Sequence, residues 1–234
     1  MVSDDVLQER MRKYYNHSSY YDRPSAAPVG RYASYSLRNI FSIYHPRQGE
    51  RVLDVGCGWG TVSFWLQRRG FDVVSVDYSA KSVKHCRREA LRLGLDASHF
   101  LVRNAVKTGF KGGSFDVVYF ADIVEHLYPA VYLAAVKEAF RVLKKGGRLV
   151  IYTPDGGHFV EFLKRHNLLL RRDPSHVHFK STGFLRSSLA SAGFRVEKSF
   201  FLPSHLPVVS FVERLLMRFV PFFRRRVAVL AVKP

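Results

Sequence analysis

Acidic residues are scarce in this chain. It has 19 Asp and Glu against 37 Lys and Arg, which gives a net charge of +18. Only five of those acids fall in residues 141–234, where 18 basic residues lie. A basic region of this kind suits nucleic acid, an anionic membrane surface or a phosphorylated substrate. A plain solvated surface explains the same charge, so charge alone leaves the partner open.

Cysteines and long apolar runs are also few or absent. The two cysteines, Cys57 and Cys86, have neither metal-site nor disulfide spacing, which favours a reducing compartment. No window holds 18 uninterrupted apolar residues, so no simple membrane-spanning helix is predicted. Residues 1–24 contain no apolar core of the signal-peptide kind. We therefore expect a cytoplasmic protein.

The chain does contain seven short apolar runs that alternate with helical patterns. The first five are rich in valine and nearly unalternated, as in strands of a sheet covered on both faces. Helical patterns over 60–70, 79–94, 128–147 and 181–194 lie between or beside them. This order predicts an α/β fold, a doubly wound, mostly parallel seven-stranded sheet of Rossmann-like type with an antiparallel last strand. The predicted strands are 51–56, 72–77, 99–104, 115–122, 148–153, 194–201 and 226–233.

We expect a single domain over residues 45–234. Residues 1–44 would form an N-terminal helical extension that covers, as a lid, the carboxyl edge of the sheet, where ligands bind in such folds. Residues 207–223 would form an amphipathic helical insert before the last strand.

A glycine-rich stretch, "RVLDVGCGWG" at 51–60, follows the first strand. Glycine lets a backbone adopt positive φ and approach a ligand closely. A triphosphate loop requires Lys-Ser/Thr after its last glycine, and Thr61-Val62 stand there instead. The spacing G-x-G-x-G differs from the dinucleotide pattern G-x-G-x-x-G, and no Tyr-x-x-x-Lys pair is present. Neither a triphosphate nor a nicotinamide dinucleotide is therefore favoured.

"VLDVGCGWG" resembles the first motif of class I S-adenosylmethionine (SAM)-dependent methyltransferases. "VVSVDYS", "GSFDVVYFADIVEHL" and "EAFRVLKKGGRLVIYTP" follow in the family's order, and the resemblance covers about 45–200. It implies SAM as cofactor, with Asp77 accepting hydrogen bonds from the ribose hydroxyls. Asn104 replaces the family's usual aspartate beside the adenine, and its amide oxygen can still accept. The implied cofactor-binding residues are Asp54, Gly56, Cys57, Gly58, Trp59, Asp77, Tyr78, Asn104, Ala105 and Ala121.

The resemblance is closest to the ubiquinone-biosynthesis O-methyltransferase branch. Methyl transfer to a hydroxyl gains from a general base, for which we expect His126 or His176, with His158, His178 and Asp122 as further candidates. In some quinone-pathway members an acid–acid–His set binds a divalent metal, which here corresponds to Asp122, Glu125 and His126. A turn-stabilising role for these residues is favoured over Mg²⁺ binding, so we predict no metal.

The segment 207–226 carries apolar side chains round most of a helix, followed by Arg224, Arg225 and Arg226. It can lie on a membrane surface, pack on the sheet or form a dimer face. We expect a SAM-dependent methyltransferase that acts on an oxygen of a hydrophobic or lipid-linked small molecule, with possible peripheral membrane contact through 207–226. The alternative is an RNA methyltransferase that uses the basic C-terminal half; no "NPPY"-like tetrapeptide or RNA-binding module is present.

Overall fold

A computed structural model of the chain describes residues 3–17, 31–168, 170, 174–205 and 207–234. Its centre is one seven-stranded sheet in the order β3-β2-β1-β4-β5-β7-β6. All neighbouring strands are parallel except β7, which runs antiparallel to β5 and to β6. The strands are β1 (Val52–Val55), β2 (Val73–Asp77), β3 (Phe100–Val102), β4 (Phe115–Ala121), β5 (Leu143–Pro154), β6 (Arg195–Leu202) and β7 (Arg226–Val232). The predicted fold class, the seven strands and the antiparallel last strand are confirmed.

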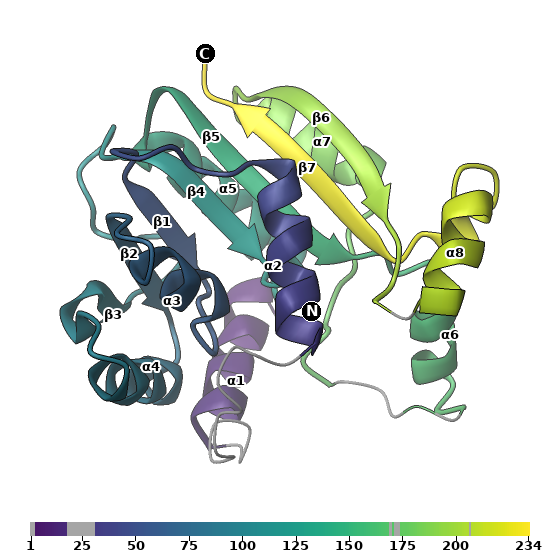
Figure 1. Cartoon of the computed structure of the whole chain (residues 1–234), viewed down its shortest axis with the longest axis horizontal. Helices are drawn as coiled ribbons and strands as arrows, with labels where there is room; N and C mark the ends of the chain where they lie inside the picture. Colours follow the sequence, from purple (N-terminus) through teal and green to yellow (C-terminus); the bar gives the residue numbers. More distant parts are fainter. Residues whose placement is uncertain (1–2, 18–30, 169, 171–173, 206) are drawn as a thin grey trace.

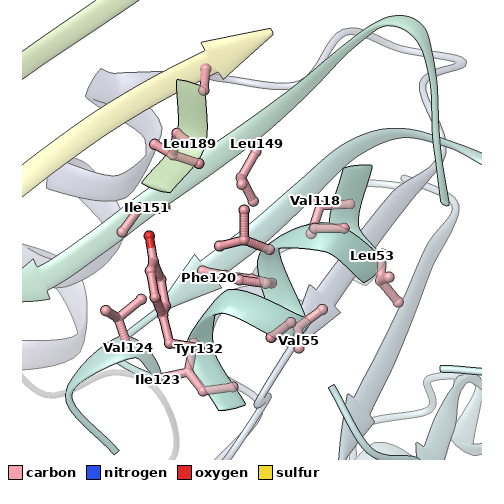
Figure 2. Close-up of a cluster of buried hydrophobic side chains, with 14 of the residues drawn as sticks. Leu53, Val55, Val118, Phe120, Ile123, Val124, Tyr132, Leu149, Ile151 and Leu189 are labelled. Atoms are coloured by element: carbon pink, nitrogen blue, oxygen red, sulfur yellow. The ribbon is translucent and has the colours of Figure 1, made fainter. Parts of the chain in front are cut away.

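Helices cover both faces of this sheet (Figure 1). Residues of α2 (Arg31–Ile43) and α3 (Thr61–Gln67) share one buried cluster with the sheet. Residues of α5 (Pro129–Val142) and α7 (Thr182–Ser191) share another, part of which Figure 2 shows. Within β4, Val118 and Phe120 enter the second cluster while Val117 and Tyr119 enter the first. This double burial explains why the central strands read as continuous apolar runs.

Helix α4 (Ala80–Arg92) begins and ends where its sequence predicts. The Ser79 hydroxyl accepts a hydrogen bond from the Ser82 amide at 3.3 Å, as an N-cap does. Gly94 adopts φ +65° just beyond the last turn, a conformation that favours glycine.

The helix predicted over 128–147 is five residues too long at its C-terminal end. α5 stops at Val142, and Leu143 already pairs with Phe115 as the first residue of β5. Lys144 leaves the helix and holds Asp116 at 2.7 Å, and Gly146 has φ +76°. Burial of Leu143 in the sheet therefore outweighs the helical pattern of the preceding residues.

The insert predicted over 207–223 is also not one helix. α8 covers Pro207–Leu216, and a separate 3-10 turn covers Pro221–Phe223. Pro221 has no amide hydrogen to continue the helix, which fits the break before it. No helix within the described ranges is long and apolar enough to cross a bilayer.

The segment 1–44 contributes α1 (Asp4–His17) and α2, while residues 18–30 of the predicted extension lie outside the described residues. α1 packs against α4 and α5, near the carboxyl ends of the parallel strands. α2 instead packs on β5, β7 and α3. The two helices of the predicted extension therefore contact different parts of the sheet domain.

Candidate functional site

A pocket lies at the carboxyl ends of β1, β2 and β4, with about 730 Å³ of empty space, its open mouth included. The position is the one where open α/β sheets bind ligands. The lining residues are Gln8, Tyr15, Val55, Gly56, Gly58, Val76, Asp77, Tyr78, Arg103, Asn104, Ala105, Asp122, Ile123, His126, Leu127 and Val131.

The glycine loop forms the floor of this pocket. Gly56 has φ +71°, and a Cβ built on it would lie 2.5 Å from Ile123 Cδ1. The amides of Gly56 and Cys57 both donate to the carbonyl of Val76, which ties the loop to β2. A side chain at position 56 would therefore both strain the backbone and clash with Ile123.

Asp77 ends β2 and presents its carboxylate to the pocket. The Gly58 amide donates to Oδ2 at 3.0 Å and the Ser79 amide to Oδ1 at 2.9 Å. Burial raises the pKa of Asp77, and these two hydrogen bonds oppose the rise. Each carboxylate oxygen has a further lone pair, so the fixed group can accept two more donors from a ligand.

Asp54, the other predicted acid, is not among the described residues that line the pocket. It is buried behind the loop, where the Ser63 hydroxyl donates to its Oδ2 at 2.5 Å. Ser75 donates in turn to Ser63 at 2.7 Å. Burial raises the pKa of Asp54 to about 6. Asp54 therefore has a structural role, since its hydrogen bond to Ser63 connects β1 to α3.

The other predicted cofactor residues divide in the same way. Tyr78, Asn104 and Ala105 line the pocket, whereas the described lining does not include Cys57, Trp59 or Ala121. The Cys57 side chain is buried in an apolar cluster, and Trp59 packs edge-to-face on His85 at 4.7 Å.

The amide oxygen of Asn104 accepts from the Val106 amide at 3.1 Å. This local hydrogen bond holds the turn after β3, which is a frequent use of asparagine.

His126 lines the pocket from the 3-10 turn Val124–His126, which follows β4. Its Nδ1 lies 2.9 Å from the carbonyl oxygen of Ser175 and 3.0 Å from the hydroxyl of Tyr15. A carbonyl can only accept, so the contact with Ser175 places the imidazole proton on Nδ1. Nε2 is then the basic nitrogen of the neutral ring.

Asp122, Glu125 and His126, for which the sequence favoured a structural role over metal binding, do not all lie in one cluster. Asp122 forms an ion pair with Arg226, while Glu125, His126 and His176 offer ligand atoms within 4.8 Å of one another. Two imidazoles and one carboxylate suit a transition metal better than Mg²⁺, which prefers oxygen ligands. The Thr153 hydroxyl donates to Glu125 at 3.0 Å, and burial raises the pKa of this carboxyl group. The cluster thus also has a structural role at the end of β5.

The remaining histidine candidates lie away from the described pocket lining. His158 is fully buried, with Nε2 2.8 Å from Glu213 and Nδ1 accepting from the Val160 amide at 3.2 Å. Both ring nitrogens therefore serve the fold. His178 is exposed, and its amide donates to the carbonyl of Glu125.

The sequence did not predict three residues that support the His126 turn. Gln8 of α1 donates to the His126 carbonyl at 3.1 Å and accepts from the Tyr128 amide at 3.2 Å. The buried Lys180 donates to the carbonyls of Val124, at 2.7 Å, and Leu127. Burial lowers the pKa of Lys180 to about 8. Gln8 and Tyr15 lie far along the chain from the quoted motifs, and Lys180 lies within the span of the family resemblance but has no role assigned by it.

The comparisons with known proteins agree with this architecture. Residues 53–151 match the family described as "Methyltransferase domain". The chain is 40% identical over 105 residues to a demethylmenaquinone methyltransferase of Beutenbergia cavernae, covering 45% of this chain and 41% of the relative. It is 39% identical over 111 residues to a ubiquinone biosynthesis O-methyltransferase of Cereibacter sphaeroides, covering 46% and 42%. The chain thus spans less than half the length of these curated relatives.

Among solved structures, a SAM-dependent methyltransferase from Archaeoglobus fulgidus superposes with a TM-score of 0.64. The alignment covers 99% of this chain and 95% of that one at 19% sequence identity. Identity this low supports the shared fold alone. The fold therefore extends over nearly the whole chain, well beyond the family match at 53–151.

Proposed function

We propose that this chain, which carries a class I SAM-dependent methyltransferase domain, moves the methyl group of SAM to an oxygen of a small hydrophobic molecule. The observation that supports this most directly is the pocket itself. It has the fixed carboxylate of Asp77 on one side and the imidazole of His126 on another. The first suits a ribose and the second suits a hydroxyl that must lose its proton.

The residues of the pocket fit SAM. The two free lone pairs of Asp77 match two adjacent ribose hydroxyls, and a Cβ at Gly56 would obstruct the close approach of the loop. Tyr78, Ala105 and Leu127 supply a partly apolar lining for the adenine. Bound SAM would supply an activated methyl group on a sulfonium.

The protein's part in the transfer is to hold the acceptor in line and to take its proton. His126 Nε2 receives the hydroxyl proton, and Nδ1–H remains bonded to the Ser175 carbonyl as the ring becomes charged. His176 lies beside it, with ring centroids 5.0 Å apart, and is the second candidate. Gln8 and Lys180 keep the turn in place, so the base does not need to reorganise during the reaction.

A lipid-linked acceptor is part of this proposal. The two curated relatives are named for demethylmenaquinone and for ubiquinone biosynthesis. The segment 207–226 would bring a cytoplasmic protein to the bilayer where such acceptors reside. The RNA alternative gains no support from these relatives. Acceptor binding that falls steeply with salt concentration would favour an RNA acceptor over a small-molecule acceptor.

A methyl-labelled SAM experiment tests the function. The full chain is incubated with labelled SAM and a cell extract, and the label is located in the lipid, RNA and protein fractions. We expect it in the lipid fraction, on an oxygen. The variant His126→Asn should slow the transfer roughly 100-fold or more and change the SAM Kd little. Label found mainly in RNA, or unimpaired transfer by His126→Asn and His176→Asn together, would contradict the proposal.

A further inference from the structure

The apolar side chains that the fold leaves exposed gather in one place. Of the fifteen large apolar side chains that are exposed among the described residues, ten lie in 162–170 and 208–222. These segments belong to α6 (Phe159–Arg165), to α8 and to the turns that follow them. Figure 1 shows α6 and α8 together at the right-hand end of the molecule, away from α3 and α4. We call residues 159–168, 170 and 207–223 the α6–α8 head.

Helix α8 buries its one acidic side chain and exposes apolar ones, the reverse of an ordinary surface helix. Glu213 is fully buried, and its carboxylate contacts His158 Nε2 at 2.8 Å and the Ser204 amide. Burial lowers the pKa of His158, while hydrogen bonds from His158 and Ser204 lower the pKa of Glu213 against the effect of its own burial. A neutral imidazole thus donates to a carboxylate, and this contact fixes the rotation of α8.

With Glu213 facing inward, the apolar residues of α8 face outward. Val208 is 79% exposed, Phe211 65% and Leu215 58%, at spacings that put them on one side of the helix. Phe219, 77% exposed, follows in the next turn. Phe222 continues the surface to α6, because its ring lies 6.2 Å from the ring of Phe162. An exposed apolar surface of this extent marks an interaction site.

Among the described residues of these segments, the exposed charges are of one sign. Residues 156–170 and 207–226 contain only two acids, Glu161 and Glu213, and both are buried. Arg165, Arg214 and Arg218 are exposed. Apolar side chains beside arginines, without an exposed acid, complement an anionic bilayer, where the rings enter the acyl region and the guanidinium groups meet the head groups. A neutral protein face would leave the arginines unmatched.

We infer that the α6–α8 head docks the protein on the surface of an anionic lipid bilayer. The apolar side of α8 and Phe222 enter the interface, and Arg214 and Arg218 contact lipid phosphates. The head follows β5 and precedes β7, so it stands at the edge of the sheet that holds the His126 turn. Glu161 of α6 lies 4.0 Å from His176, which links the head to the acceptor side of the pocket. The inference rests on the proposed function only for the source of the acceptor.

The test is flotation of the full chain with vesicles of phosphatidylcholine, with and without phosphatidylglycerol. We expect binding only when the anionic lipid is present. Phe211→Asp with Phe219→Asp should lower the partition coefficient at least about tenfold. Arg214→Glu with Arg218→Glu should lower it about fivefold or more per arginine, and high salt should have a similar effect. All four side chains are exposed, so these variants keep the fold.

Two matched controls separate the head from general surface effects. Leu91→Asp with Leu133→Asp places acids on exposed apolar sites of α4 and α5, and Arg186→Glu with Lys198→Glu reverses exposed charges elsewhere. Neither pair should change flotation. Equal loss in controls and head variants would overturn the inference, as would a dimer that buries the head and no flotation by the unmodified chain. SAM affinity, measured in the same samples, reports on the proposed function independently. If the unmodified chain floats with vesicles but does not bind SAM, the proposed function is contradicted and the docking surface is still supported.

Discussion

The donor side and the acceptor side of the pocket are built in different ways. The donor side is formed by the ends of β1 and β2 and by the loops that follow them. There the main-chain amides of Gly58 and Ser79 donate to the Asp77 carboxylate. The acceptor side is formed by groups from distant segments, as when the Tyr15 hydroxyl and the Ser175 main-chain carbonyl meet the His126 side chain. Backbone recognition needs a short, ordered motif, whereas a side-chain constellation exists only after folding. The two sides should therefore respond separately to substitution.

The largest effect should come from Asp77→Ala on the donor side. The loss of two charge-assisted hydrogen bonds to the ribose should raise the SAM Kd at least roughly 100-fold. Isothermal titration calorimetry measures this. Asp72→Ala removes an exposed acid just before the same strand and serves as the control. If both variants weakened SAM binding equally, the proposed contact between the Asp77 carboxylate and the ribose would be contradicted.

Next in size is Lys180→Met on the acceptor side. The carbonyls of Val124 and Leu127 would lose their buried donor, which should cost about 1–3 kcal/mol of unfolding free energy. Methyl transfer should fall roughly tenfold because the His126 turn loosens, with the SAM Kd nearly unchanged. Denaturant titration and initial rates measure the two effects. A parallel rise in the SAM Kd would show that the two sides are not separable.

Glu138→Gln probes the scaffold outside the pocket lining, where Glu138 of α5 contacts Thr108 and Arg141. Burial opposes ionisation of Glu138, but hydrogen bonds from Arg141 and Thr108 outweigh it and bring its pKa to about 2 from 4.5. The carboxylate thus stabilises the fold fully above about pH 4.5, and this contribution fades as the pH falls toward 2. Because Arg141 is half-exposed, the contribution should not exceed about 2 kcal/mol. Urea unfolding of the variant should show a shallower loss of stability across that range; an unchanged slope would contradict the assignment.

The smallest effect should come from Tyr15→Phe. It removes a hydroxyl 3.0 Å from His126 Nδ1 but leaves the Ser175 carbonyl in place. We expect methyl transfer to fall about threefold, with the fold intact, since one hydrogen bond of an existing pair is lost. A pH–rate profile is the measurement. A loss as large as that of His126→Asn would make Tyr15 a proton carrier in its own right.

The sequence was most informative where structure depends on neighbouring residues. The valine-rich strands, the helix predicted over 79–94 and the glycine loop after the first strand follow from local pattern, and all appear as predicted. The sequence was less informative where burial determines the local conformation or the direction of a side chain. Leu143 left the predicted helix for the sheet, and Glu213 turned inward to His158, which a helical wheel alone cannot show.

The acceptor site was the least predictable part. His126 and His176 were predicted from a motif and a general chemical argument, yet Gln8, Tyr15 and Lys180, which hold the His126 turn, come from segments distant from it in the chain. Of the disfavoured metal candidates, Glu125 and His126 lie near His176, while Asp122 is paired with Arg226 of the last strand. Contacts between residues so distant in the chain follow from topology, which local spacing does not encode.

Calorimetric titration of the unmodified full chain with SAM tests the central claim most directly. The account predicts saturable binding to a single class of sites, which S-adenosylhomocysteine displaces and Asp77→Ala abolishes. His126→Asn should retain that binding. Absence of SAM binding by the unmodified chain, or binding that survives Asp77→Ala undiminished, would contradict the account.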